Sequence, residues 1–192
     1  MKTDVRKLAR VLRWLVLAVF VLNLICLPMV PGFVGLLVDG GPGMIRKAFY
    51  HHFVNDGLGF KSLPMYFWTV LGEFWKDGTL TLWTGFFWLC GTCTAVMIWQ
   101  AKRILDAILA GEPFSMANAH SIKRAALCCW VISAAALARL ILWLWAEGNP
   151  APLFTYTALF VPAFFMAGLL FQVMSALFRQ AAELKEDQDL TI

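Results

Sequence analysis

The chain has 192 residues, of which 60% are hydrophobic and only 15% are charged. This length leaves room for one membrane domain and for no separate globular one. The formal net charge of +4 does not indicate direct nucleic-acid binding, because that would need a basic face on a soluble module.

Four segments carry almost no charge: residues 14–38, 80–101, 125–146 and 150–178. About 20 apolar residues are enough for a helix to cross the ~30 Å hydrocarbon core of a bilayer. Inside lipid every backbone N–H and C=O must be paired within the segment, so each of these segments is expected to be a helix. The sequence therefore predicts an all-α integral membrane protein, a four-helix transmembrane bundle embedded in the lipid bilayer.

The distribution of Lys and Arg predicts how the chain is oriented. Residues 1–13 and the connection 102–124 carry basic residues close to span ends, whereas residues 147–152 carry none and residues 39–79 have no net bias. Basic residues near span ends are retained on the cytoplasmic side. We therefore place both termini and residues 102–124 in the cytoplasm.

The first span raises two questions. Its basic start and apolar run fit a signal peptide, but the run continues well past an h-region of about 7–15 residues, so we expect a retained span. Pro28 and Pro31 each remove a backbone donor near the outer end of this span. They predict either that the helix stops there or that it bends, and a bent helix can line a cavity.

The external connection, residues 39–79, is rich in aromatic residues. Residues 44–53 and 64–76 alternate apolar and polar side chains at helical spacing, yet both stretches are too short to span. They suit helices that lie in the membrane interface, or a lid over the outer mouth of the bundle. His51 and His52 are adjacent, so they point to different helix faces and do not predict a shared metal.

The connection 102–124 predicts a cytoplasmic helical hairpin. The second helix meets no breaker before Gly111, which suits a left-handed C-terminal cap, and Pro113 prevents continuation. Ser115 suits the N-cap of the next helix. Phe114 and Met116 are then placed at the turn.

The fourth helix is expected to continue into a cytoplasmic tail, residues 179–192, because apolar side chains keep a helical spacing past the end of the span. Acidic residues follow in this tail. At a helix C-terminus they oppose the macrodipole, so helix stability does not explain them. They are Glu183, Glu186, Asp187 and Asp189.

No residue pattern predicts an enzyme, a cofactor site or a metal site. The chain lacks HExxH, GxSxG and a glycine-rich phosphate loop. Cys90 and Cys93 have CxxC spacing, but they lie inside a predicted span, where the reactive thiolate is disfavoured. All five cysteines are interpreted as small packing residues.

Arg139 is the only formal charge deep within a predicted span. Such a charge is a functional hypothesis by default, yet Arg139 lies about two turns from the outer end and can reach the interface by snorkelling. It either anchors the structure, for example to Glu73 or Asp77, or binds an anionic ligand. The second option gives an alternative function, a small-molecule transporter or ligand sensor that uses the bent first span. A chain of this size would transport only as a homo-oligomer.

Two motifs resemble those of one bacterial membrane family. Gly111, Pro113, Phe114 and Asn118 fit the family's G-x-P-F-x-x-x-N hairpin. Residues 178–192 are similar to its C-terminal signature F-x-x-G-x-x-L-x-x-E-x-D-L-T-I/V, with alanine at the usual glycine and Asp187 near an expected Glu. The family is known as domain of unknown function 2975, and its members are four-span proteins of similar length.

The family has no established activity, so this resemblance implies a kind of partner and no reaction. Family members are often encoded beside a small helix-turn-helix DNA-binding protein, which implies a membrane partner that sequesters or modulates such a transcription regulator. It also implies the bacterial cytoplasmic (inner) membrane. The residues expected to dock the partner lie in the hairpin and the tail: Phe114, Met116, Asn118, Glu183, Glu186, Asp187, Asp189, Leu190, Thr191 and Ile192.

Negative charge in the tail would steer a basic DNA-binding partner toward the membrane. Alternatively, the tail folds back on the hairpin, where basic side chains pair with its carboxylates. Those basic residues are Lys102, Arg103, Lys123 and Arg124. The two arrangements can coexist.

Overall fold

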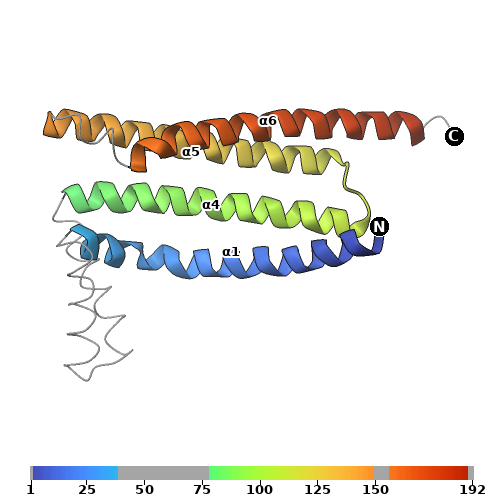
Figure 1. The fold of residues 1–192 in the computed structure, drawn as a ribbon, viewed down its shortest axis with the longest axis horizontal. Helices are drawn as coiled ribbons and strands as arrows, with labels where there is room; N and C mark the ends of the chain where they lie inside the picture. The colour runs from blue at the N-terminus through green and yellow to red at the C-terminus, as the bar shows by residue number, and fades with distance from the viewer. Residues whose placement is uncertain (1, 39–77, 149–155, 190–192) are drawn as a thin grey trace, which may run out of the picture. The chain divides into compact units, whose positions relative to one another are not determined.

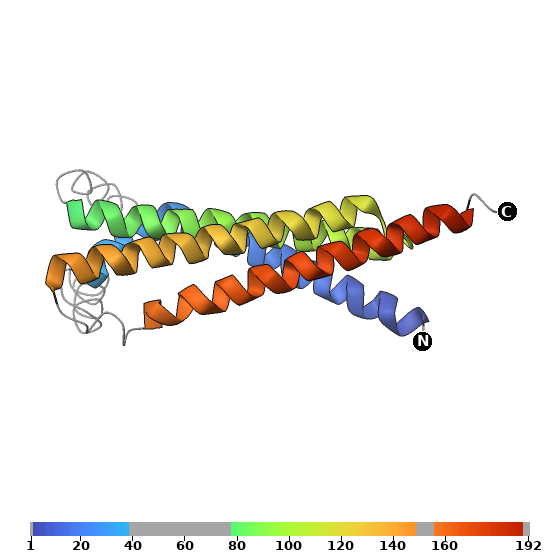
Figure 2. The ribbon, with the colours of Figure 1, turned by 90° about the horizontal axis from the view of Figure 1, so that it is seen from above.

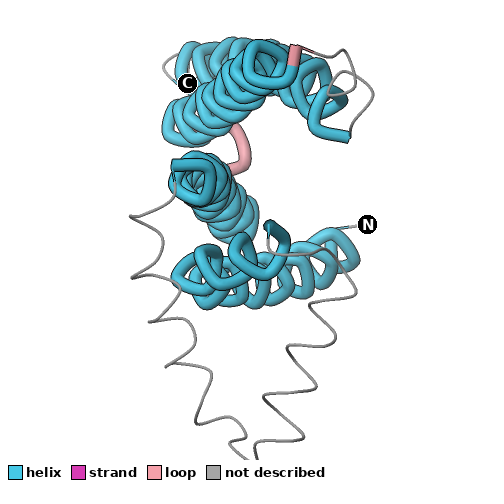
Figure 3. Tube along the Cα trace, turned by 90° about the vertical axis from the view of Figure 1, so that its left-hand side faces the viewer, coloured by secondary structure: helices cyan, strands magenta, loops and turns pink. Residues whose placement is uncertain are grey.

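The computed structural model describes residues 2–38, 78–148 and 156–189 (Figure 1). These ranges hold four α-helices: α1 (Lys2–Val38), α4 (Gly78–Ala110), α5 (Met116–Glu147) and α6 (Tyr156–Asp189). Within the same ranges there is no strand (Figure 3). The all-α fold with four helices is confirmed. The external stretches 44–53 and 64–76, with His51 and His52, lie outside the described residues.

Each helix contains a candidate membrane span, and the four spans are Lys7–Pro31, Thr81–Ala110, Met116–Ala146 and Ala158–Gln188. All of them exceed the roughly 20 residues that a bilayer requires. The chain is therefore a multi-pass membrane protein.

The chain divides into two compact units. The first unit contains residues 1–23 and 90–192, and the second contains residues 24–89. In the first unit α5 is the most buried helix. Of its most apolar 18-residue stretch, 44% is buried, compared with 11% of the corresponding stretch of α6. The core of this unit therefore lies along α5.

Two hydrogen bonds hold α5 against α6. Ser133 Oγ donates to the carbonyl of Val161 at 2.8 Å, and Ser175 Oγ donates to the carbonyl of Ala119 at 2.8 Å. The two bonds are 14 residues apart on α5 and also 14 residues apart on α6. The helices therefore run antiparallel in constant register for about 21 Å, side by side in Figure 2.

Between these two bonds Gly168 of α6 packs directly against α5. A Cβ atom at this position would overlap the Trp130 ring and would lie 3.3 Å from the carbonyl oxygen of Ala126. Small side chains also occupy most of the buried positions of α5, including Ala126, Cys129 and Ala136. Helices in lipid associate through such close packing, because apolar side chains gain little by leaving apolar lipid tails.

The first unit also joins α5 to α4 through sulfur atoms. Cys129 Sγ donates to Met97 Sδ at 3.4 Å, and the thiols of Cys93 and Cys128 hydrogen-bond to each other. All five cysteines are free thiols. The sulfur atoms that form contacts between α4 and α5 thus belong to Cys93, Met97, Cys128 and Cys129.

The N-terminal part of α1 packs on α4 within the same unit. Arg13 Nε lies 2.9 Å from Asp106 Oδ1, and the rings of Phe20 and Trp99 have centroids 5.4 Å apart. The ion pair is partly exposed, so its contribution to stability is expected to be below about 1 kcal/mol. It places the basic start of α1 beside the end of α4.

In the second unit, α1 does not stop at its prolines but continues as a helix to Val38. Pro31 has no N–H, so the carbonyl of Leu27, four residues earlier, lacks its usual helical donor. Trp88 Nε1 donates to this carbonyl at 2.9 Å. Pro31 and Val34 are fully buried at this contact. An indole from α4 therefore replaces the hydrogen bond that the proline removes.

Candidate functional site

The turn between α4 and α5, residues 111–115, has the caps that the sequence predicts. Gly111 has φ 90°, and the N–H groups of Gly111 and Glu112 donate to the carbonyls of Ile108 and Ala107 at 3.2 and 3.0 Å. This pattern is a Schellman motif, which satisfies the last carbonyls of α4. Ser115 is extended, and its Oγ accepts from the Asn118 N–H at 3.3 Å.

Asn118 holds this hairpin turn together. Its side-chain Nδ2 donates to the carbonyl of Pro113 at 2.8 Å and lies 3.5 Å from that of Glu112. Asn118 is only 3% exposed, and it is the one buried side chain among the described residues of the predicted docking set. Its amide therefore positions the turn, and the side chain offers no outer surface to a partner.

A pair of aromatic rings joins the hairpin turn to α6. The rings of Phe114 and Phe178 have centroids 5.5 Å apart. Phe114 nevertheless remains 48% exposed. Met116 is half-buried beside this contact. The structure thus brings the hairpin turn into contact with α6 at the residue before the tail.

Beyond Phe178, α6 continues as a helix to Asp189, which adds about 16 Å (Figure 2). Glu186 and Asp187 are exposed on this extension. Glu183 Oε1 accepts from Arg179 Nε at 2.8 Å across one helical turn. The side chain of Asp189 and residues 190–192, including Leu190, Thr191 and Ile192, lie outside the described part of the chain.

Some of the basic residues near the hairpin already have neighbours in the bundle. Lys102 Nζ lies 3.8 Å from Asp106 Oδ2 and 4.7 Å from the centre of the Trp99 ring. Lys123 lines a pocket between α5 and α6. The alternative in which the tail folds back on these basic residues stays a prediction.

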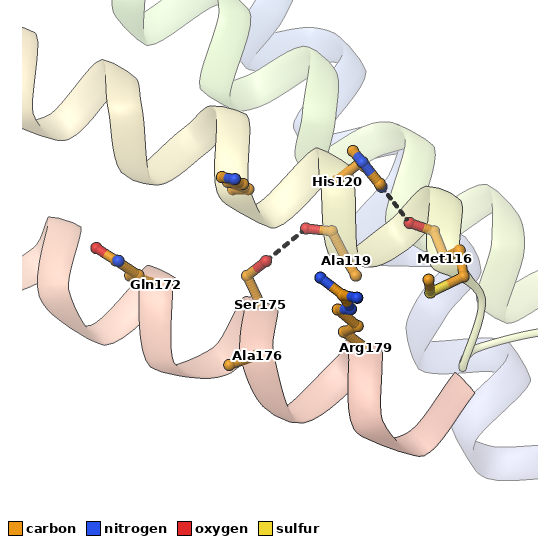
Figure 4. A pocket seen from close by; sticks show the side chains of 8 residues that line it. Met116, Ala119, His120, Gln172, Ser175, Ala176 and Arg179 are labelled. Carbon is orange, nitrogen blue, oxygen red and sulfur yellow. Dashed lines mark hydrogen bonds between the residues drawn. The ribbon is translucent and has the colours of Figure 1, made fainter. Parts of the chain in front are cut away.

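The pocket between α5 and α6 has a volume of about 230 Å³ (Figure 4). His120 and Lys123 line it from α5, and Gln172, Ser175 and Arg179 line it from α6. His120 Nδ1 lies 3.0 Å from the carbonyl of Met116, and since a carbonyl only accepts, this nitrogen donates. Sequence reasoning missed the pocket, because only the register of the two helices brings Lys123 and Arg179 to one place.

Arg139 lies half-buried on α5. The carboxylates suggested as its partners, Glu73 and Asp77, lie outside the described residues. In the described ranges, no group of three or more His, Cys, Asp or Glu side chains is arranged to hold a metal ion.

The fold and the hairpin define a multi-pass, all-α membrane protein. A family model with the description "Protein of unknown function (DUF2975)" matches residues 61–192. The chain belongs to this family, as its hairpin and tail motifs suggested. The match begins at Lys61, so it also covers the aromatic stretch 64–76. No curated protein and no solved structure matches the chain.

Proposed function

We propose that this protein is a non-enzymatic membrane partner that sequesters or modulates a small helix-turn-helix transcription regulator. The observation that carries the proposal is the contact between Phe114 and Phe178, which joins the hairpin turn to α6 just before its acidic end. The resemblance to the family supplies the kind of partner. The hairpin and both termini face the cytoplasm of a bacterium in this proposal, as the basic residues beside the spans indicate.

The exposed ring of Phe114 gives the surface an apolar centre. Full burial of a phenylalanine side chain stabilises by roughly 1.5–3 kcal/mol, and about half of this ring is still exposed. A partner that covers it gains about 1 kcal/mol from this ring alone. Binding of a partner, together with the contact to Phe178, then explains why the hairpin motif has a phenylalanine at position 114.

The carboxylates give the same surface its charge. Glu186 and Asp187 are exposed on the last turns of α6, within about 16 Å of the aromatic contact. DNA-binding proteins carry basic side chains that neutralise phosphates. An acidic surface attracts these side chains and competes with DNA for them, so a docked regulator is held away from its operator.

The test is co-purification of the full-length protein with the helix-turn-helix protein encoded beside it. Phe114→Ser and the double variant Glu186→Lys/Asp187→Lys should each remove most of the partner, as should deletion of residues 187–192. The charge variant should also lose the salt dependence of the interaction, since the carboxylates act through electrostatics. Insertion and helix content should not change.

Glu147→Lys is the matched control, because Glu147 is at the opposite end of α5. It should retain the partner. Unchanged co-purification in the hairpin and tail variants would refute the proposal, and so would the absence of a helix-turn-helix gene beside this one.

A further inference from the structure

We propose that the pocket between α5 and α6 is a binding site for a phosphate group, and that this phosphate is the headgroup of an anionic phospholipid. The proposal does not depend on the regulator hypothesis. It rests on the charges that line the pocket, on the rigid register of its walls and on its depth relative to the membrane.

The charges come first. Lys123 and His120 from α5 and Arg179 from α6 line the same pocket, and none of the described lining residues is acidic. Arg179 uses its Nε for Glu183. A guanidinium has five N–H donors, so the remaining donors of its planar fork are available to an oxyanion. Gln172 adds a neutral amide donor to the wall.

The walls hold these charges in place. The Ser175–Ala119 hydrogen bond lies within the pocket, and the close contact of Trp130 with Gly168 lies about two turns toward the other end of the pair. Lys123 and Arg179 thus face one pocket from two helices that cannot separate freely. Two cations that line one pocket repel each other, and Glu183 offsets this repulsion only on the Arg179 side. An anionic occupant removes this repulsion.

The depth of the pocket identifies the source of the anion. The stretch from Lys123 to Glu147 and the stretch from Tyr156 to Arg179 are each about 35 Å long at 1.5 Å per residue. The hydrocarbon core is about 30 Å thick. The candidate spans of α5 and α6 are longer than this core, so with Glu147 and Tyr156 at its far edge both cations lie just outside it. They are then at the level of the headgroups, where basic pockets between transmembrane helices bind anionic lipids.

The size of the pocket and its surroundings suit a lipid. A volume of about 230 Å³ is below the roughly 300–1,000 Å³ of sites that enclose a whole small molecule, but it has room for a phosphate. Leu127 lies one turn from Lys123 on the same face of α5 and is 60% exposed, and Phe171 is likewise exposed one turn from Ser175 on α6. These side chains offer an apolar path for the acyl chains.

The experiment uses the purified full-length protein in detergent, with bound lipid counted by native mass spectrometry and stability followed by thermal unfolding. Phosphatidylglycerol should be retained and should raise Tm, whereas phosphatidylcholine, which has no net charge, should do neither. Lys123→Gln/Arg179→Gln should weaken phosphatidylglycerol binding by roughly 30-fold, since each cation near the membrane surface is worth about a factor of five.

Arg124→Gln/Lys185→Gln is the matched control, because it removes the same charge from exposed positions that do not line the pocket. It should change the affinity less than about threefold. Equal losses in the two double variants would show diffuse surface attraction and would overturn the site. Equal protection by inorganic phosphate would overturn the lipid headgroup as the source.

Ala176→Phe provides a test that leaves every charge in place. Ala176 lines the pocket, so the larger side chain should fill it and weaken phosphatidylglycerol binding. This variant decides the question if the double charge variant does not fold. Unchanged lipid retention in Ala176→Phe would contradict the proposal.

Discussion

Hydrogen bonds from side chains to backbone carbonyls join the helices in both units, but the carbonyls differ. In the α5–α6 pair, the carbonyls of Ala119 and Val161 lie inside continuous helices, and the residues four positions later carry an N–H. In the second unit, the carbonyl of Leu27 would have Pro31 as its helical donor, and proline has none.

The serine bonds therefore use the second lone pair of a carbonyl that already has a helical donor. Trp88 instead donates to a carbonyl whose helical donor is missing. In water the difference would be small. In a bilayer an unsatisfied carbonyl has no solvent to bind, so removing the Trp88 donor should cost more than removing either serine. Similar distances of 2.8 and 2.9 Å thus conceal unequal contributions to stability.

The largest effect is expected at the close contact that allows the serine bonds to form. Gly168→Ala should lower the free energy of unfolding by about 3 kcal/mol, because the new Cβ overlaps the Trp130 ring and lies close to the carbonyl of Ala126. Chemical unfolding in detergent measures the change. Gly85→Ala is the control, since a Cβ there meets no atom within 4 Å. If both variants were equally stable, close packing would not hold α5 to α6.

The next largest effect is expected at Trp88. Trp88→Phe keeps an aromatic ring but leaves the Leu27 carbonyl without a donor, so it should cost about 2 kcal/mol. Pro31→Ala restores an N–H four residues after Leu27. In the Pro31→Ala background, Trp88→Phe should therefore cost less than about 1 kcal/mol. Equal costs in the two backgrounds would show that the indole acts by packing alone.

The smallest effect is expected from the serines themselves. Ser133→Ala and Ser175→Ala should each cost about 0.6 kcal/mol, the typical value for a hydrogen bond between transmembrane helices. Since the bonds are about 21 Å apart, the two costs should add. Ser121→Ala is the control, because Ser121 Oγ donates within its own helix, to Ala117 at 3.0 Å. A loss at Ser133 as large as that at Trp88 would contradict the comparison.

Local sequence determines the parts of the fold that could be predicted. The spans follow from long runs without charge, and the hairpin turn follows from Gly111 and Ser115, whose backbone preferences act within a few residues. The half-buried Arg139 likewise lies on α5, the helix that contains the predicted span 125–146. These features need no knowledge of which helices touch.

Contacts between helices could not be predicted in the same way. The sequence shows that Pro31 frees a carbonyl, but it does not show that Trp88, more than fifty residues later, reaches it. Lys123 and Arg179 become neighbours in one pocket only through the register of α5 and α6. Asn118 was expected on the docking surface from its motif, and its burial depends on the shape of the turn.

The replacement of one hydrogen bond by another couples the residue at position 31 to the residue at position 88. A chain without the proline would regain a backbone donor for the Leu27 carbonyl and would not need the indole there, whereas a chain with the proline would. The family match begins at Lys61, so it includes Trp88 but not Pro31. Among relatives, variation at the position of Trp88 should therefore follow whether the first helix carries a proline.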